Sequence, residues 1–303
     1  VSMATQEHEG RDPSLVVGTI SFPGKGLIRG IASSTDSTVY VLRGTCVYTL
    51  TSGGQFEPFA GSPEQRGNAD GHRLNQALFN TPNGIFASSS DIYICDNVLS
   101  VIKIISADEV TTFAGTAETH GWKDGPRAEA LFNGPSSAVL FRETLFVSDY
   151  RNNCIRIISS DGIVSSVGSI AGHDDGPFSS ATFDQPSGLC VSPTNTILVA
   201  DSGSRRVRSI DVDEQSVTTI AGGGAAREDG PGPKAGFGTL SGITASPATG
   251  EIYLVDFSYN RMRCIDSTGT VSTLCGSSRG ERDGSLATAL LLCPDFCCMS
   301  PNG

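Results

Sequence analysis

The sequence predicts an all-β fold, a β-propeller of four-stranded antiparallel blades, on three observations. First, an Asp-Gly pair recurs with a period of just over fifty residues, at Asp70, Asp124, Asp175, Asp229 and Asp283. Second, each copy leads into short apolar runs bounded by Gly, Pro, Asp and Ser, the signature of strands. Third, no segment keeps the 3.6-residue period of a helix. Four short strands repeated at this interval are typical of a propeller blade.

The unit that begins at Asp124 shows the order of the predicted elements. Phe132 and Pro135 precede a first strand, "SAVLF" (137–141), and a second strand, "TLFVSD" (144–149), ends in Asp. A third strand, "CIRII" (154–158), carries a basic residue. We predict the fourth strand at "SIAG" (169–172), by analogy with "VTTFAG" (110–115) and "VTTIAG" (217–222). Phe132 is predicted to wedge between blades.

The register predicts five complete blades and part of a sixth, in a full-length protein with six. The N-terminal "VVGTISFPG" (16–24) is similar to a fourth strand, and "CPDFCCMSPNG" (293–303) to a first strand. Sharing one blade between both ends of a chain removes exposed sheet edges. Residues 1–15 are predicted to be a flexible arm before a single propeller domain, 16–303. The complete blades are expected at about 30–61, 82–115, 135–172, 186–222 and 240–276.

These repeats carry a family resemblance. The pattern Pro-x-Gly-Ile/Leu, a second strand ending in Asp, Ile/Val-Arg/Lys-x-Ile and Val-Thr/Ser-Thr-x-Ala-Gly resembles the NHL repeat, over roughly residues 16–303. The resemblance implies a propeller that serves as a binding platform, although related propellers include lyases and lactonases. Fold alone does not decide between these functions.

The charge composition indicates which kinds of partner the protein can bind. The net charge is −11, with 21 basic against 32 acidic residues, and no basic run is present. Phosphate recognition needs clustered Lys and Arg, so nucleic acid is disfavoured. No apolar run reaches the roughly 18 residues of a membrane-spanning helix. We expect a protein or peptide partner, whose basic segments would gain association rate from the acidic surface, and no cofactor.

The Asp that ends each second strand is predicted to be structural. A basic residue follows it by seven positions across a tight turn, so a hydrogen bond or ion pair can fix that turn. A carboxylate repeated in every blade is spread around the disc and cannot converge on one ion. The Asp of each Asp-Gly pair is likewise predicted to cap its own turn. The predicted pairs are Asp96 with Lys103, Asp149 with Arg156, Asp201 with Arg208, and Asp256 with Arg263.

The starts of the inner strands are predicted to surround the mouth of the central channel. They supply one amide, three hydroxyls and one carboxylate, from Asn83, Ser136, Ser187, Ser241 and Asp295. This set is poor for calcium or zinc and suits water or a weak polar ligand. No metal site is therefore predicted. A metal-dependent propeller hydrolase or lyase at this mouth is the alternative to a non-catalytic protein- or peptide-binding module.

The long loops between blades and the turns after the second strands should share one face, the expected binding surface. Trp122, the sole tryptophan, lies in such a loop, either as an interface anchor or tucked beneath it. His120 and His173 fall in different loops and are predicted to be solvent-exposed, although they remain candidates for binding there. Most cysteines are predicted to be core residues, with a disulfide involving Cys293, Cys297 or Cys298 as the alternative.

Overall fold

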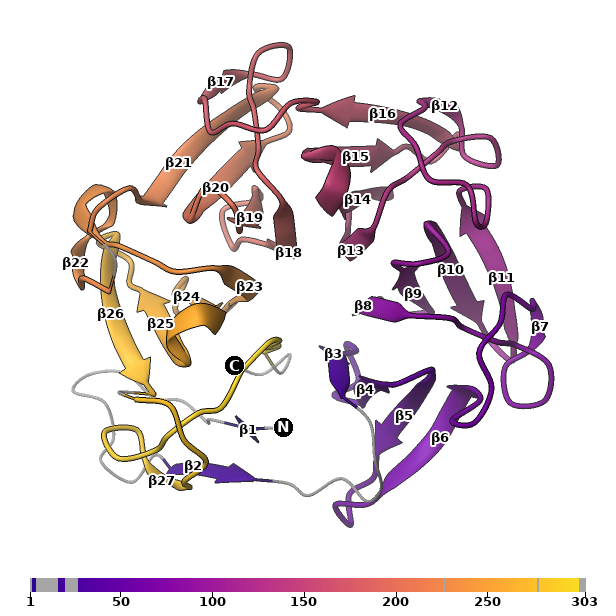
Figure 1. Ribbon diagram of the computed structural model, residues 1–303, viewed down its shortest axis with the longest axis horizontal. Helices are drawn as coiled ribbons and strands as arrows, with labels where there is room; N and C mark the ends of the chain where they lie inside the picture. The colour runs from indigo at the N-terminus through magenta and orange to yellow at the C-terminus, as the bar shows by residue number, and fades with distance from the viewer. Residues whose placement is uncertain (1, 4–15, 20–26, 226, 277, 300–303) are drawn as a thin grey trace.

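The computed structural model describes residues 2–3, 16–19, 27–225, 227–276 and 278–299. Its strands form six sheets arranged around a central axis, like the blades of a propeller (Figure 1). Every paired strand in these sheets is antiparallel to its neighbour, and four successive strands run from the channel to the rim. The predicted all-β propeller with five complete blades is confirmed.

We number the complete blades in chain order. Blade 1 contains β3 (Ile28–Ser33), β4 (Val39–Arg43), β5 (Cys46–Leu50) and β6 (Phe56–Gly61). Blade 2 contains β8 (Pro82–Ala87), β9 (Asp91–Asp96), β10 (Val101–Ser106) and β11 (Glu109–Ala114). Blade 3 contains β13 (Pro135–Phe141), β14 (Thr144–Asp149), β15 (Cys154–Ile158) and β16 (Ile163–Val167). Blade 4 contains β18 (Pro186–Val191), β19 (Ile197–Asp201), β20 (Arg206–Asp211) and β21 (Ser216–Gly222). Blade 5 contains β23 (Leu240–Ala245), β24 (Ile252–Asp256), β25 (Arg261–Ile265) and β26 (Thr270–Cys275).

Helical structure among the described residues is confined to three short 3-10 turns. They are η1 (Tyr150–Asn152), η2 (Gly232–Lys234) and η3 (Phe257–Tyr259). A membrane-crossing helix is therefore absent from the described ranges.

The two ends of the chain meet in a partial sixth blade. Here β2 (Val16–Thr19) pairs with both β1 (Ser2–Met3) and β27 (Gly284–Ser285), so it takes the place of an outer strand. The segment 293–299 runs beside blade 5, where the Gly242 N–H donates to the Asp295 carbonyl at 2.9 Å. On its other side the Ser33 hydroxyl donates to the Met299 carbonyl at 2.6 Å. Of the predicted flexible arm, residues 1 and 4–15 lie outside the described residues, as do 20–24 and 300–303 of the predicted shared blade.

The fourth strand of blade 3 was predicted in the wrong place. The structure forms β16 from "IVSSV", not from "SIAG" at 169–172. Gly168 follows this strand with a φ of +83°, as Gly115 follows β11 with a φ of +99°. The letters "SIAG" imitate the end of an outer strand but belong to the connection to blade 4. Val167, buried in the core, is therefore the counterpart of Cys275, rather than Ala171.

The sequence predicted that the Asp-Gly segments lie on one face of the disc. This prediction is wrong, because the segments pair with outer strands at the rim. The first four run along the rim as a short fifth strand on the outer strand of the following blade, and the last pairs with β2 of the partial blade. Figure 1 shows them at the periphery. In blade 3, Gly125 faces Val164 and Pro126 faces Ile163. These rim strands are β7 (Gly71–His72), β12 (Gly125–Pro126), β17 (Gly176–Pro177), β22 (Gly230–Pro231) and β27.

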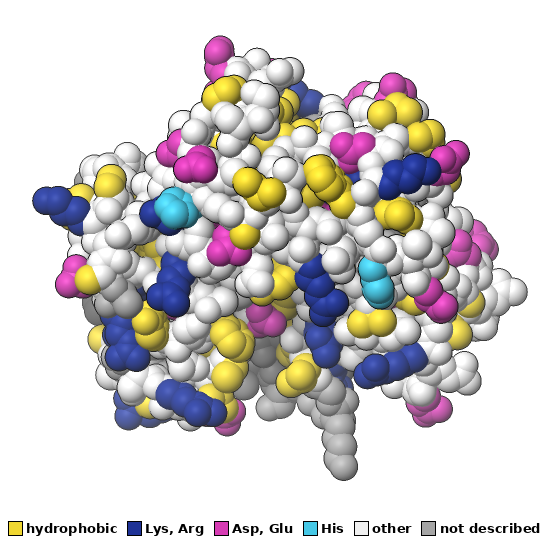
Figure 2. Space-filling view, turned by 45° about the horizontal axis from the view of Figure 1, so that its top comes forward, with side chains coloured by type: hydrophobic (Ala, Val, Ile, Leu, Met, Phe, Trp, Pro, Cys, Tyr) yellow, Lys and Arg dark blue, Asp and Glu magenta, His cyan; other side chains and the backbone are white. Residues whose placement is uncertain are grey.

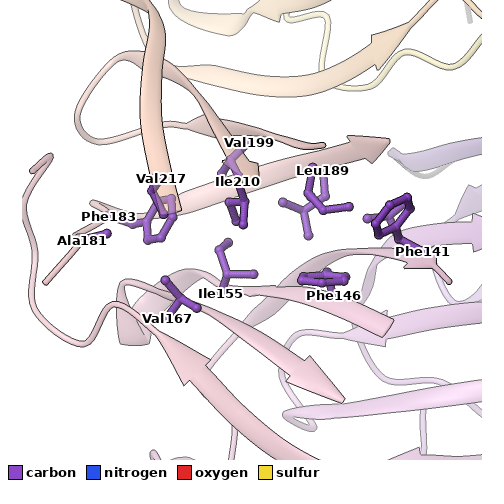
Figure 3. Packing of buried hydrophobic residues seen from close by; sticks show 12 residues of the cluster. Phe141, Phe146, Ile155, Val167, Ala181, Phe183, Leu189, Val199, Ile210 and Val217 are labelled. Atoms are coloured by element: carbon purple, nitrogen blue, oxygen red, sulfur yellow. The ribbon is translucent and has the colours of Figure 1, made fainter. Parts of the chain in front are cut away.

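Hydrophobic side chains fill the space between adjacent blades. Phe183 lies between blades 3 and 4, against Ile155 and Val167 of one and Ile210 and Val217 of the other (Figure 3). Burying one such side chain stabilises the fold by about 1.5–3 kcal/mol. Phe132 fills the preceding gap in the same way, so the predicted wedge is confirmed. The equivalent buried positions in the other gaps are Phe79, Phe237 and Leu291.

Candidate functional site

A buried basic residue ties together the two predicted carboxylates at each joint. The Arg156 guanidinium donates to Asp149 at 2.9 Å and to Asp124 at 2.8 Å. It also donates to the carbonyls of Leu131 and Lys123, which fixes the connection that carries Phe132. The same arrangement recurs with Arg208, Asp201 and Asp175, and with Arg263, Asp256 and Asp229. Lys103 pairs with Asp70 instead, and Asp96 accepts hydrogen bonds from the amides of Asn80 and Thr81, so the predicted pair of Asp96 with Lys103 is wrong.

The Asp of each Asp-Gly pair does not cap its own turn. Asp175 accepts hydrogen bonds from the amide and the hydroxyl of Thr219, both at 2.9 Å, on the outer strand of the next blade. Asp124 accepts from the Ser166 hydroxyl at 2.7 Å. Because the segment pairs as a rim strand, its carboxylate faces the sheet. Asp70 and Asp229 bind Thr112 and Thr273 in the same way, and Asp283 precedes the rim strand β27.

The electrostatics of these carboxyls follow their burial. Burial raises the pKa of Asp149 and Asp256, and it raises the pKa of Asp201 to about 6. Hydrogen bonds from backbone amides and the nearby arginine lower these pKa values, but burial has the larger effect. Burial also acts on the half-exposed Asp70, but hydrogen bonds from Lys103 and Thr112 outweigh it and lower the pKa. These groups hold the fold together, and their hydrogen-bonding capacity is spent within the joint.

The predicted mouth residues do not point at a common centre. The Ser136 hydroxyl lies 3.0 Å from that of Ser148 and donates to the Ser187 carbonyl of the next inner strand at 3.3 Å. The Ser187 hydroxyl donates to the carbonyls of Leu240 and Ser241 at 3.0 and 3.1 Å. The expectation that these hydroxyls are available to a ligand is therefore wrong for two of the three. A bulge at the start of each inner strand directs them between blades.

The other half of the ring keeps unused polar groups. The Ser241 hydroxyl is buried and has no hydrogen-bond partner of ordinary geometry in the structure. Burial raises the pKa of the neighbouring Asp295 to about 6, although Ser241 and Arg29 both act to lower it. Within the described ranges, no hydrogen bond is formed by the side chains of Arg29 or Asn83. Arg29 is a sixth ring member that the sequence reasoning missed, although Gly30 after it matches the Gly of Pro-x-Gly.

The channel contains an apolar cavity of about 250 Å³, next to these strand starts. Its lining includes Phe86, Leu140, Cys190, Phe296, Cys297 and Met299, and no charged residue. Burial raises the pKa of the Cys298 thiol to about 11, so the thiol is protonated at neutral pH. None of the nine cysteines forms a disulfide in the structure, including Cys293, Cys297 and Cys298. The alternative, a disulfide involving one of these three, is not formed in the structure.

The loop residues are dispersed, and one of them is prominent. Trp122 is 53% exposed, and its indole Nε1–H donates to the Ser166 hydroxyl of the neighbouring outer strand at 3.0 Å. The ring is thus fixed at the rim without being covered. His120 lies 2.7 Å from the Ser100 hydroxyl, and His173 is exposed in another connection. The described residues contain no group of three His, Cys, Asp or Glu side chains arranged to hold a metal ion.

Comparison with known proteins agrees with this architecture. A family model described as NHL repeat matches residues 183–208. NHL repeat-containing protein 2 of Homo sapiens is 32% identical over 114 residues, which are 37% of this chain and only 16% of that protein.

Two solved structures share the fold at low sequence identity. A streptogramin B lyase has a TM-score of 0.58 at 14% identity and covers 92% of this chain and 89% of its own. A nidogen/laminin complex contributes a chain with a TM-score of 0.61 at 14% identity, covering 87% and 84%. Likeness at this level shows the fold alone. The repeated joints, the blades and the matched repeat together support an NHL-repeat β-propeller.

Proposed function

We propose that this propeller is a non-catalytic protein- or peptide-binding module, and that the rim around Trp122 is a binding surface. The observation that carries the proposal is an exposed indole held in one orientation by Ser166. Tryptophan is over-represented among residues that dominate binding energy. A ring that is already fixed loses little conformational entropy when a partner binds. The nidogen/laminin complex offers a precedent for a propeller in a protein assembly.

A basic partner segment fits this surface. The exposed Glu129 forms an ion pair with Lys123, the residue after Trp122, and Asp124 remains partly exposed. Lys or Arg over an indole face gains about 0.5–1 kcal/mol at an exposed site. The net charge of −11 would add to the association rate, since long-range attraction steers encounters.

The test is a selection from a random peptide library displayed on phage, with the Trp122→Ala variant used for counter-selection. We expect peptides enriched in Lys and Arg, whose affinity by calorimetry falls roughly tenfold with Trp122→Ala. Ile170→Ala, which removes an exposed apolar side chain from another connection, is the matched control and should leave affinity unchanged. Peptides that bind wild type and Trp122→Ala equally would contradict the proposal.

The alternative, a metal-dependent hydrolase or lyase, has less support in the mouth residues. Asp295 is the one carboxylate in the ring, and Ser136 and Ser187 are engaged with backbone carbonyls. Soaking crystals with calcium or zinc tests this alternative directly. An ordered ion bound by Asn83 and Asp295 would favour the enzyme over the binding module.

A further inference from the structure

The two faces of the disc carry opposite charge. We call the face formed by the turns after the second strands and the starts of the inner strands the turn face. The opposite, hairpin face consists of the remaining turns within blades. Charged residues in the described turns of the hairpin face are Asp36, Asp108, Asp161, Asp213, Asp266, Glu143, Glu214 and the buried Glu251, with Arg142 the one base; Asp91 and Asp211 lie at the strand ends beside these turns. The hairpin face thus carries much of the negative charge of this chain, whose net charge is −11, whereas the turn face is rich in arginine.

Arginines gather on the turn face and are free of ion pairs. Arg29 starts an inner strand, Arg151 lies in η1, and Arg205 lies in the turn between β19 and β20. Arg206 and Arg261 begin the third strands of blades 4 and 5, and Arg227 stacks at 4.3 Å on the Tyr259 ring of η3. Within the described residues, none of these six guanidiniums lies within 4 Å of a carboxylate, whereas Arg73, Arg142, Arg156, Arg208 and Arg263 elsewhere all do.

Carboxylates on this face are few and do not cancel the arginines. Asp295 is buried at the channel mouth, and Asp184 lies beside Gly203 near the turn of blade 4. Glu118 lies at the edge of the face, where its amide donates to the Leu99 carbonyl. With Glu228, which follows Arg227 in the connection to blade 5, these are four carboxylates against the six arginines, so the arginines remain in excess.

Exposed apolar side chains lie among these arginines. Leu27 and Leu292 precede the inner strands of blade 1 and of the partial sixth blade, at 72% and 40% exposure. Val98 and Phe257 lie in the turns of blades 2 and 5. Figure 2, an oblique view, shows Lys and Arg together with Asp, Glu and exposed hydrophobic side chains on the visible surface. Charge mixed with apolar contacts is typical of a protein interface, where both terms contribute.

From these observations we infer that the turn face binds an acidic peptide segment with interspersed apolar side chains. The six unpaired arginines offer charge complementarity, and a guanidinium can bind a carboxylate through two parallel hydrogen bonds. A nucleic acid is a poorer fit, because its phosphates make no use of Leu27, Val98, Phe257 or Leu292. A longer polyanion would also meet the partly exposed Asp124 and Asp175 at the rim. This site borders the rim around Trp122, because the Asn152 side-chain amide of η1 donates to the Gly121 carbonyl at 2.8 Å, but Trp122 is not one of its residues.

The test uses a fluorescein-labelled twelve-residue peptide of alternating Glu and Leu, with the Gln–Leu analogue and a twelve-nucleotide single-stranded RNA as comparisons. Fluorescence anisotropy measures binding at low and physiological salt. We expect the wild type to bind the Glu–Leu peptide, more weakly as salt rises, and the Gln–Leu peptide at least tenfold less tightly. Phe257→Ser should weaken binding at both salt concentrations without changing the salt dependence.

A matched pair of triple variants separates the turn face from overall charge. Arg151, Arg205 and Arg227, all exposed, are replaced together by Glu, and we expect at least a tenfold loss of affinity. The control replaces the exposed Arg66, Arg127 and Lys234 of the connections between blades by Glu, which changes the net charge equally. It should change affinity less than threefold.

Three results would overturn the inference: no binding of the Glu–Leu peptide, equal losses in both triple variants, or RNA binding tighter than the peptide. Trp122→Ala should leave peptide binding intact. Failure here is thereby distinguishable from failure of the proposed rim site.

Discussion

At the scale of single residues, the joints depend on charges that are completely removed from water. Arg156 and Asp149 are both fully buried, and the guanidinium lies 4.6 Å from the centre of the Phe132 ring. Desolvating two ions is costly, and the pair is tolerated because carbonyls and a second carboxylate complete its hydrogen bonds. Removing either Arg156 or Asp149 would therefore leave the other as a buried charge without its counter-ion.

Removing the Arg156 guanidinium should therefore strongly destabilise the fold. Arg156→Met leaves the Asp149 carboxylate buried without its counter-ion, and we expect a loss of about 3–5 kcal/mol in the free energy of unfolding. Lys123→Met, which breaks an exposed ion pair with Glu129, should cost about 0–1 kcal/mol. Urea denaturation followed by circular dichroism measures both. Similar losses in the two variants would refute the structural role of Arg156.

Asp295 predicts a dependence on pH. Its pKa is about 6 in the folded protein, above the ordinary value of 3.8, because burial disfavours the charged form. Between these values the folded protein keeps a proton that the unfolded chain has released, so stability falls as pH rises through this window. Asp295→Asn avoids this loss and should be more stable than wild type by about 1–3 kcal/mol above pH 6.

The comparison is made by urea denaturation near pH 4 and near pH 7.5, with the exposed Glu129→Gln as control. The gain from Asp295→Asn should shrink toward the lower pH, and the control should show none at either. A gain that is equal at both pH values would rule out titration of Asp295 as its cause.

At the scale of elements, the connection between blades is the unit that repeats. It leaves an outer strand, pairs at the rim, and returns through a buried aromatic residue to the next inner strand. The last connection uses Leu291 where the others use Phe, so the gap tolerates a smaller side chain. The error over the fourth strand of blade 3 arose here, since "SIAG" in the connection copies the ending of a strand.

The position of Phe132 between blades predicts that stability falls further as its side chain is made smaller. Phe132→Ala leaves a cavity between blades 2 and 3 and should cost about 3–5 kcal/mol, whereas Phe132→Leu should cost about 1–2 kcal/mol. Phe257→Ala, at a partly exposed aromatic residue, should stay within about 0.5 kcal/mol. The free energy of unfolding by urea gives all three values. Equal losses for Leu and Ala would mean that Phe132 does not fill the gap.

At the scale of the whole molecule, the ring is closed by residues from the two ends of the chain. Val17 faces Gly284, and Val16 faces Ser285, across the β2–β27 pair. Closure gives the outer edge of the partial blade a hydrogen-bonded partner, which an open edge would lack. The same circular arrangement places arginines of different blades together on the turn face.

Deleting residues 1–19 should open this closure. Hydrogen–deuterium exchange is expected to accelerate roughly tenfold or more in 283–291, because local protection depends on the lost pairing. Peptides from blade 3, on a distant part of the ring, serve as the internal control and should exchange as in the full chain. Unchanged exchange in 283–291 would show that β2 does not stabilise the sixth blade.

The sequence alone determined the propeller, its complete blades and three of the four carboxylate–base pairs, because these follow from local strand patterns repeated at a fixed interval. Only the tertiary structure decided where the Asp-Gly segments lie, since Asp124 reaches Ser166 across forty-two positions of the chain. It also turned Ser136 and Ser187 toward neighbouring carbonyls and brought Arg29 into the mouth ring. Pairing between blades is a long-range contact, and no local pattern shows which arginines it leaves free on the turn face.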